Sequence, residues 1–479
     1  MNDLRPGFLR AILHTTVALA TAIGSAGAQS VDRSRAPQVP PAAAFEFPHV
    51  QGPSVLANGL RVYVIEDHSV PVVSVRVVTA ADSTFDPPGK EGLYAVTLGA
   101  LTEETATRSA EQLAAEATDI GTRVTPVGFT TTTSFFPRAL SLLADMLTRP
   151  RIDSDAVQRR KALQSAAARR IAQLTVTTPR HLFYSALYGV DDPYVRSLVP
   201  SQASIASITT SDVRSFYTSW FRPDRTTIVI TGDVNGEAFR QVQRAFGAWR
   251  GAEVTPPSRE LAAMPARPTT IYLYDAPGTQ AYVYVGAAGP NRTSSESYAA
   301  DVMSAIALVR FQQALRDKRS FMYSGATGMT WRRASRPSAF VGSTLVPADK
   351  VDSALAEWLS ILRGLRGAEP MSAAELASAK RIRVGPLAAR IDGADSLSAR
   401  LAEIVRDTLP LDYWDRYAAR VSALTLPDVT AAAERILDMD HLVIVVAGDR
   451  KVIEPTLRAA NIAPVVLVDA NGRPPSPEK

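Results

Sequence analysis

The chain has 479 residues, of which 46% are hydrophobic and 21% charged, so it can bury a large core and should contain at least two domains. The 52 basic and 47 acidic side chains give a formal net charge of +5, and no basic run is interleaved with aromatic residues as a nucleic-acid groove requires. The absence of cysteine excludes disulfides, thiolate metal sites and lipid attachment to a thiol.

The N-terminus has the pattern of an export signal. Arg5 and Arg10 precede an apolar, alanine-rich stretch at 11–22, and Ala26-Gly27-Ala28 is a small-x-small cleavage site. We therefore expect residues 1–28 to be a signal peptide and the protein to be periplasmic or secreted. An uncleaved N-terminal anchor is the alternative. No later run reaches about 18 uninterrupted apolar residues, so no integral membrane segment is expected after cleavage.

A first half is predicted at 54–250, after a proline-rich arm at 29–53 that should be extended and not packed. Runs rich in β-branched residues predict strands, and apolar residues at helical spacing predict helices. The strands are expected at 60–65, 72–77 and 226–231, with a strand pair within 122–136. The helices are expected at 91–103, 109–120, 138–147, 155–174, 211–220 and 236–249.

A second half is predicted at 269–460, after a proline-containing linker at 251–268. Its order of elements begins again, with strands at 270–274 and 281–285 and then a helix at 294–316. Residues 461–479 should form a terminal strand and a disordered tail.

One spacing supports an internal repeat. Asp212 opens a helix that leads into a strand ending at Gly232-Asp233, and Asp428 opens a helix that leads into a strand ending at Gly448-Asp449 after the same interval. We interpret Asp212 and Asp428 as residues that cap helix starts. The predicted fold is α+β, with two similar half-domains, each a mostly antiparallel sheet covered by helices.

Several segments, in their order and spacing, resemble the insulinase (pitrilysin) superfamily of zinc peptidases in its bacterial half-length form. The resemblance spans roughly 54–457. Its segments are Leu56-Ala57-Asn58-Gly59-Leu60-Arg61-Val62, Leu187-Tyr188-Gly189 with Asp192-Pro193-Tyr194, Phe221-Arg222-Pro223-Asp224, and Leu315-Arg316-Asp317-Lys318 through Tyr323.

The resemblance implies a zinc motif, H-x-x-E-H, on the helix after the opening strands. Here Ala95 and Gly99 occupy the histidine positions and Leu98 occupies that of the catalytic glutamate. The helix expected to supply the distal ligand contains no glutamate between 155 and 179. None of these side chains can donate an electron pair to zinc, so we expect no metal bound by this chain.

The resemblance also implies a role for Arg316 and Tyr323. In active relatives this pair reaches the zinc from the second half; the arginine would orient the substrate backbone and the tyrosine would donate a hydrogen bond to the developing oxyanion. The alternative is structural, with Arg316 packing its stem on the helix and Tyr323 an ordinary strand aromatic. Relatives have a glycine-rich turn before this segment, whereas Ala307–Arg310 lacks glycine, so the helix should be continuous.

We therefore hypothesise a non-catalytic, substrate-binding subunit of an exported heterodimeric zinc peptidase. It would be inactive alone and would supply Arg316 and Tyr323 to a homologous subunit that carries the intact motif and the zinc. A homodimer is also compatible with the sequence. The alternative function is a peptide-binding or scaffold protein that uses a peptidase-like cavity without chemistry.

Overall fold

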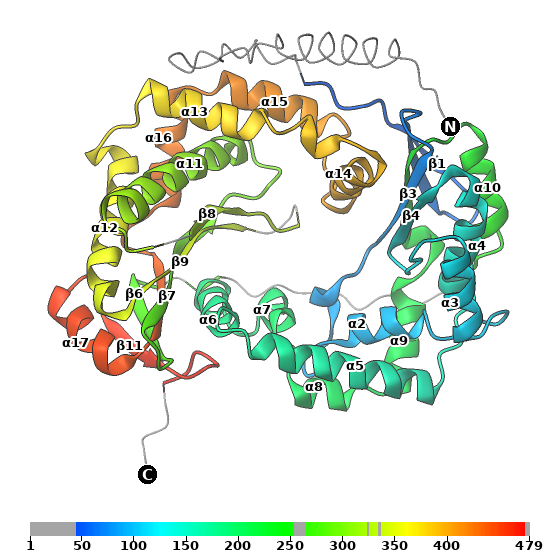
Figure 1. Ribbon diagram of the computed structural model, residues 1–479, viewed down its shortest axis with the longest axis horizontal. Helices are drawn as coiled ribbons and strands as arrows, with labels where there is room; N and C mark the ends of the chain where they lie inside the picture. The colour runs from blue at the N-terminus through cyan, green and yellow to red at the C-terminus, as the bar shows by residue number, and fades with distance from the viewer. Residues whose placement is uncertain (1–44, 253–263, 266, 323–324, 334–336, 475–479) are drawn as a thin grey trace, which may run out of the picture. The chain divides into compact units, whose positions relative to one another are not determined.

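The computed structural model describes residues 45–474 except 253–263, 266, 323–324 and 334–336, and the described residues form one compact unit. Its frame is two mixed β-sheets, each built from one half of the chain (Figure 1). This confirms the predicted α+β class with two similar halves. The predicted signal peptide and most of the linker lie outside the described residues.

The first sheet has the strand order β1-β2-β5-β3-β4. β2 and β5 pair in parallel, and the other three pairings are antiparallel. Its strands are β1 (Gln51–Val55), β2 (Arg61–Glu66), β3 (Val72–Thr79), β4 (Gly128–Thr132) and β5 (Thr226–Gly232). The helices of this half are α2 (Leu93–Ala100), α3 (Ala110–Asp119), α4 (Phe136–Thr148), α5 (Ser154–Ala172), α6 (Thr177–Tyr188), α7 (Pro193–Leu198), α8 (Gln202–Ser207), α9 (Thr210–Trp220) and α10 (Glu237–Phe246).

The second sheet has the strand order β11-β6-β10-β7-β9-β8. Its strands are β6 (Thr270–Asp275), β7 (Gln280–Gly289), β8 (Gly325–Thr330), β9 (Ser338–Pro347), β10 (Val443–Gly448) and β11 (Val465–Val468). The helices of this half are α11 (Glu296–Phe311), the π-helix η4 (Gln312–Lys318), α12 (Val351–Arg363), the π-helix η6 (Gly364–Ala368), α13 (Ala373–Val384), α14 (Ala394–Arg406), α15 (Tyr413–Ala423), α16 (Leu426–Ile436) and α17 (Arg450–Ala460).

The internal repeat is visible in both the sheets and the helix starts. β5 lies between parallel β2 and antiparallel β3, and β10 lies in the same way between β6 and β7. Each central strand follows a helix that begins with a capping box, Thr209 with Asp212 in α9 and Thr425 with Asp428 in α16. The two aspartates accept hydrogen bonds from the backbone N–H of Thr209 and Thr425, which would otherwise lack a partner. Their predicted capping role is confirmed.

The two halves exchange covering helices. Side chains alternate between the faces of a strand, so Val73 and Val75 of β3 enter the core of their own half while Ser74 faces the other way. That second face of the first sheet is covered by α14 of the second half (Figure 1). The Oγ of Ser74 contacts the Oγ of Ser398 at 2.9 Å, and the Oγ1 of Thr231 donates to the carbonyl of Ala394 at 2.5 Å.

In return, α6 of the first half covers one face of the second sheet (Figure 1). Ile444 and Val446 of β10 face the helices of their own half, whereas Val443 and Val445 face α6. α6 lies at nearly the same distance before α9 as α14 lies before α16, so the repeat includes this exchange. Each half therefore completes the core of the other.

Three local predictions need correction. The strand pair expected within 122–136 is the single strand β4, followed by a 3₁₀ turn at Thr133–Phe135. The proline-rich arm is packed at its end, because Phe47 is buried and residues 51–53 belong to β1. The helices α6 to α8 were not predicted.

None of the helices in the described ranges combines the length and apolarity needed to cross a membrane.

Candidate functional site

The three positions that the resemblance assigns to a zinc motif lie together on α2. Ala95, Leu98 and Gly99 are half-buried, and their spacing places them on one side of the helix. The helix is anchored by buried residues on its other side, which include Val96 and Ala100. The three positions that the resemblance assigns to a metal motif therefore share one helix face, and none of them carries a group that can bind a metal.

Arg160 of α5 fills the space beside Gly99. A Cβ atom added to Gly99 would lie 2.7 Å from the Cδ of Arg160, which is closer than packed carbon atoms approach. The guanidinium continues to Thr102, donating to its Oγ1 at 2.8 Å, and pairs with Glu103 at 2.5 Å. Glu103 is buried and also accepts from Arg159 at 2.8 Å. An arginine stem and its ion pairs thus stand where a residue 99 side chain would project.

This arrangement does not fit a zinc ion. Hydrogen and alkyl side chains offer no lone pair, and a metal cation next to Arg160 would be repelled by its positive charge. Throughout the described ranges, no cluster of three or more histidine, cysteine, aspartate or glutamate side chains is suited to hold a metal. No chemical step can be assigned to a metal at this position of the chain.

The start of α2 is held by a buried carboxylate. Asp86 accepts hydrogen bonds from the backbone N–H groups of Gly92 at 2.8 Å and Tyr94 at 2.7 Å, which are free donors at the helix start. Burial raises the pKa of Asp86 to about 7, although these two hydrogen bonds oppose the change. The helix that carries the degenerate positions therefore begins at a group that titrates near neutral pH.

Arg316 lies at the far end of a continuous helix in the second half. α11 runs into η4 without a break, as the absence of glycine predicted, and single π-helical turns are common at functional sites. Leu315 is buried, whereas Arg316 is exposed and makes no side-chain hydrogen bond or ion pair with another described residue. The exposed neighbour Arg319 pairs with Glu357 at 3.1 Å.

Tyr323 lies outside the described residues, so its predicted approach to Arg316 stays a prediction. It falls between Met322, which is buried in the core, and Gly325, which begins β8. The chain therefore passes from the Arg316 helix into the second sheet through the tyrosine position.

A cross-half contact that the sequence did not predict lies just after β8. Arg332 is buried and pairs with Asp192 at 3.0 Å, and its guanidinium lies over the rings of Tyr188 and Tyr194 at 4.2 and 4.7 Å. Asp192 also starts α7 by accepting from the N–H of Tyr194. The Tyr188 and Asp192-Pro193-Tyr194 segments, which carried part of the family resemblance, thus form a binding site for an arginine of the other half.

The next residue reaches the segment before α2. Arg333 pairs with Asp82 at 3.0 Å and donates to the carbonyl of Ala80 at 2.8 Å. Asp82 and Asp86 belong to the short stretch that sets the start of α2. The Arg332-Arg333 dipeptide was visible in the sequence, but its partners lie more than 130 residues away and no local pattern names them.

Comparison with known proteins agrees with the fold. A family model described as the peptidase M16 inactive domain matches residues 207–383, a range that contains Arg316 but not the degenerate positions on α2. An uncharacterised zinc protease of Mycobacterium leprae is 24% identical over 289 residues, which cover 57% of this chain. The aligned part is 64% of that relative, so the chain spans less than two thirds of its length.

Solved structures extend the similarity across both halves. The crystal structure of a peptidase M16 inactive domain from Pseudomonas fluorescens matches with a TM-score of 0.71 and 21% identity, covering 82% of this chain and 97% of that one. The crystal structure of a protease from Helicobacter pylori matches with a TM-score of 0.75 and 17% identity, covering 84% and 99%. At these identities, the structural matches establish the fold.

Proposed function

We propose that the chain is a non-catalytic member of the M16 peptidase superfamily and the substrate-binding subunit of an exported two-subunit zinc peptidase, because the M16 inactive-domain model matches residues 207–383. Its partner would be a homologous chain with an intact metal motif, and the zinc would reside there. This chain would hold the peptide and present Arg316 and Tyr323 to the partner's site. The protein would act in the periplasm or outside the cell.

The observation that carries the proposal is the contrast between α2 and the end of α11. At α2, Ala95 and Gly99 offer no lone pair, and the Arg160 stem lies beside Gly99, which supports a subunit that binds no zinc itself. At the end of α11, Arg316 is exposed and unpaired within the described residues. A guanidinium in this state can bind the backbone carbonyl or the C-terminal region of a peptide. The Tyr323 hydroxyl would donate to the oxyanion that develops during hydrolysis.

The first test combines the chain with a homologue that carries the intact metal motif. We expect the chain alone to hold no stoichiometric zinc and to cleave no peptide, and the pair to cleave peptides faster than the homologue alone. Zinc content and cleavage rates measure this. Equal cleavage with and without this chain would contradict the proposal, as would tightly bound zinc in this chain alone. Peptide binding without a partner, unaffected by chelators, would instead support the scaffold function.

The second test removes the presented groups. We expect Arg316→Ala and Tyr323→Phe to lower the turnover of the complex, by about 10²- to 10³-fold for the tyrosine, as for the loss of other oxyanion donors. Assembly, measured by size-exclusion chromatography, should be unchanged. Arg319→Ala is the matched control, because Arg319 is also exposed but pairs with Glu357. Normal turnover in both variants would show that Arg316 and Tyr323 take no part in peptide cleavage and have only a structural role.

A further inference from the structure

Two adjoining cavities lie between α4 and α10 of the first half, and neither includes α2 or Arg316. Their volumes are about 380 and 180 Å³, and both are lined by Pro137 and Gln241. We call the two cavities together the α4–α10 groove. Its larger cavity falls within the usual size of small-ligand pockets.

Small side chains leave this space between the helices. Ala144 of α4 and Ala238 and Ala245 of α10 line the groove, and Leu140 also contributes to its lining. The large apolar residues of the same helices, such as Phe246, are buried in the core instead. The helices are therefore held by the core beneath, and the groove is a property of the packed fold.

The two ends of the groove carry opposite charges. Arg149 and Arg244 line the end formed by the last turns of α4 and α10. Asp233 and His68 line the end formed by the first turns of the same helices. Asp233 accepts from His68 and from the Oγ1 of Thr133, both at 2.8 Å. The hydrogen bond between Asp233 and His68 lowers the pKa of Asp233 and raises the pKa of His68, so the negative form of Asp233 is favoured and His68 is its present partner, which a ligand amino group would replace.

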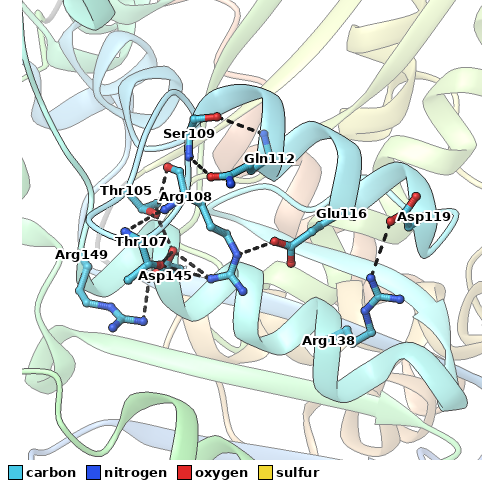
Figure 2. Close-up of polar contacts among 10 residues, drawn as sticks. All are labelled: Thr105, Thr107, Arg108, Ser109, Gln112, Glu116, Asp119, Arg138, Asp145 and Arg149. Atoms are coloured by element: carbon cyan, nitrogen blue, oxygen red, sulfur yellow. Dashed lines mark hydrogen bonds and ion pairs between the residues drawn. The ribbon is translucent and has the colours of Figure 1, made fainter.

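The arginine end is built to receive an anion. Arg149 is fixed by Asp145, whose Oδ1 lies 2.8 Å from the guanidinium, and Figure 2 shows the hydroxyls of Thr105 and Thr107 on the same carboxylate. Arg244 is exposed and forms no ion pair with another described residue. Among the described residues no carboxylate pairs with the Arg244 guanidinium, and Arg149 lines the same cavity.

A polar acceptor lies between the two ends. The Oε1 of Gln241 is buried and has no hydrogen-bond partner among the described residues, although Gln241 lines both cavities. Buried acceptors without a partner are uncommon in native proteins, because each costs the desolvation of the group. A ligand N–H in the middle of the groove would satisfy this acceptor.

The partial charges of the helix ends have the reverse direction, about +0.5 at the first turns and −0.5 at the last. They oppose the side chains but are smaller than the full charges of Arg244 and Asp233. The side chains therefore set the polarity of the groove. A ligand that matches them is negative at one end, positive at the other, and carries amide N–H groups between.

We propose that the α4–α10 groove binds a short peptide of three or four residues with free termini. Its carboxylate would lie at Arg244 and Arg149, its amino group at Asp233, and a backbone N–H at Gln241. The lining residues from Pro137 to Ala144 span about 10 Å of helix at 1.5 Å per residue, and an extended peptide covers about 3.4 Å per residue. The proposal is independent of the subunit role, since none of these residues belongs to that site.

The test is calorimetric titration of the full chain with the tripeptide Ala-Leu-Ala and with its N-acetylated and C-amidated forms. We expect saturable binding of the free tripeptide, with an affinity about tenfold or more weaker after amidation, because a charge-assisted hydrogen bond is lost. Acetylation should also weaken binding. Absence of saturable binding by the free peptide at millimolar concentration would overturn the proposal, as would equal affinity for the free and amidated forms.

Substitutions in the α4–α10 groove test whether the tripeptide binds there. Arg244→Gln should lower the affinity for the free tripeptide about as much as amidation does. It should also abolish the difference in affinity between the free and the amidated forms. Arg240→Gln is the matched control on the same helix, because Arg240 pairs with Glu237 and lines neither cavity. Ala245→Leu, or Ser141→Leu on the exposed rim, should fill the groove and abolish binding without lowering the melting temperature. Unchanged binding in both filled variants would place the peptide elsewhere and overturn the proposal.

Discussion

The two sheets are covered in the same way but by different chemistry. α14 meets β3 of the first sheet through polar groups: Ser398 contacts Ser74 and accepts from the Nε of Arg76 at 2.8 Å, and Asp395 pairs with Arg76 at 2.9 Å. Beside this polar strip, Ile65 and Val229 of the first sheet are buried in the core cluster of the second half, which includes Leu397 and Leu401 of α14. α6 meets the second sheet through an apolar cluster. One topology thus supports two kinds of interface.

The difference indicates how each half is held. Apolar burial is non-directional and scales with the area removed from water, so the α6 interface should contribute more to stability. The polar α14 interface gains little net energy per hydrogen bond but fixes the register, because a buried group left unpaired is costly. The buried carboxylate at the start of α2 extends this polar pattern in the first half.

The largest effect is expected where the apolar interface is tightest. Phe183 of α6 is fully buried, and its ring lies so close to Gly286 of β7 that a Cβ there would be 2.8 Å away. We expect Phe183→Ala to lower the free energy of unfolding by about 3–5 kcal/mol, from lost burial and the remaining cavity. Urea denaturation measures this. Leu163→Ala, at an exposed position of α5, is the control and should change stability by at most about 0.5 kcal/mol. A loss near the control value would contradict the dominant role of the apolar interface.

The next effect depends on pH and belongs to the first half. The pKa of Asp86 is about 7 in the folded chain and 3.8 without its surroundings, so folding favours the protonated form. Its contribution is complete below about pH 4 and is lost as the pH rises through 7. We expect Asp86→Asn to remove this loss, on the order of 2–4 kcal/mol, because the amide stays neutral. Urea denaturation from pH 4.5 to 8.5 measures the slope. Parallel pH profiles for the two proteins would show that Asp86 does not titrate in this range.

Local patterns predicted the elements that a few neighbouring residues determine. The capping aspartates Asp212 and Asp428 and the β-branched runs of β2, β3 and β5 are signals of this kind, whereas the N-cap threonines Thr209 and Thr425 were not predicted. α6 was not predicted, because it is buried along most of its length and shows no polar stripe, and Thr177-Thr178-Pro179 resembles a loop.

For the candidate site, too, the sequence predicted the local features but not the contacts between distant segments. The family resemblance located Ala95, Leu98 and Gly99, their spacing placed them on one helix face, and the missing glycine predicted the continuous helix before Arg316. The position of Arg160 over Gly99 depends on how α5 packs against α2, and the Arg332 contact depends on the pairing of distant segments. Neither contact has a periodic pattern in the sequence, so only the folded structure shows that Arg160 packs beside Gly99.

The smallest effect tests the polar interface itself. Ser398 is fully buried and donates to the carbonyl of Asp395 at 2.7 Å while accepting from Arg76. We expect Ser398→Ala to cost about 1–3 kcal/mol, because the buried Ser74 hydroxyl loses one hydrogen-bond partner and the half-buried Arg76 guanidinium loses another. Ser422→Ala, at an exposed position of α15, is the matched control and should be nearly neutral. If Ser398→Ala costs as much as Phe183→Ala, the two interfaces stabilise the fold equally and hydroxyl contacts are as important as aromatic packing. A smaller cost, measured under the same conditions, keeps α6 as the principal link between the halves and α14 as the element that sets their register.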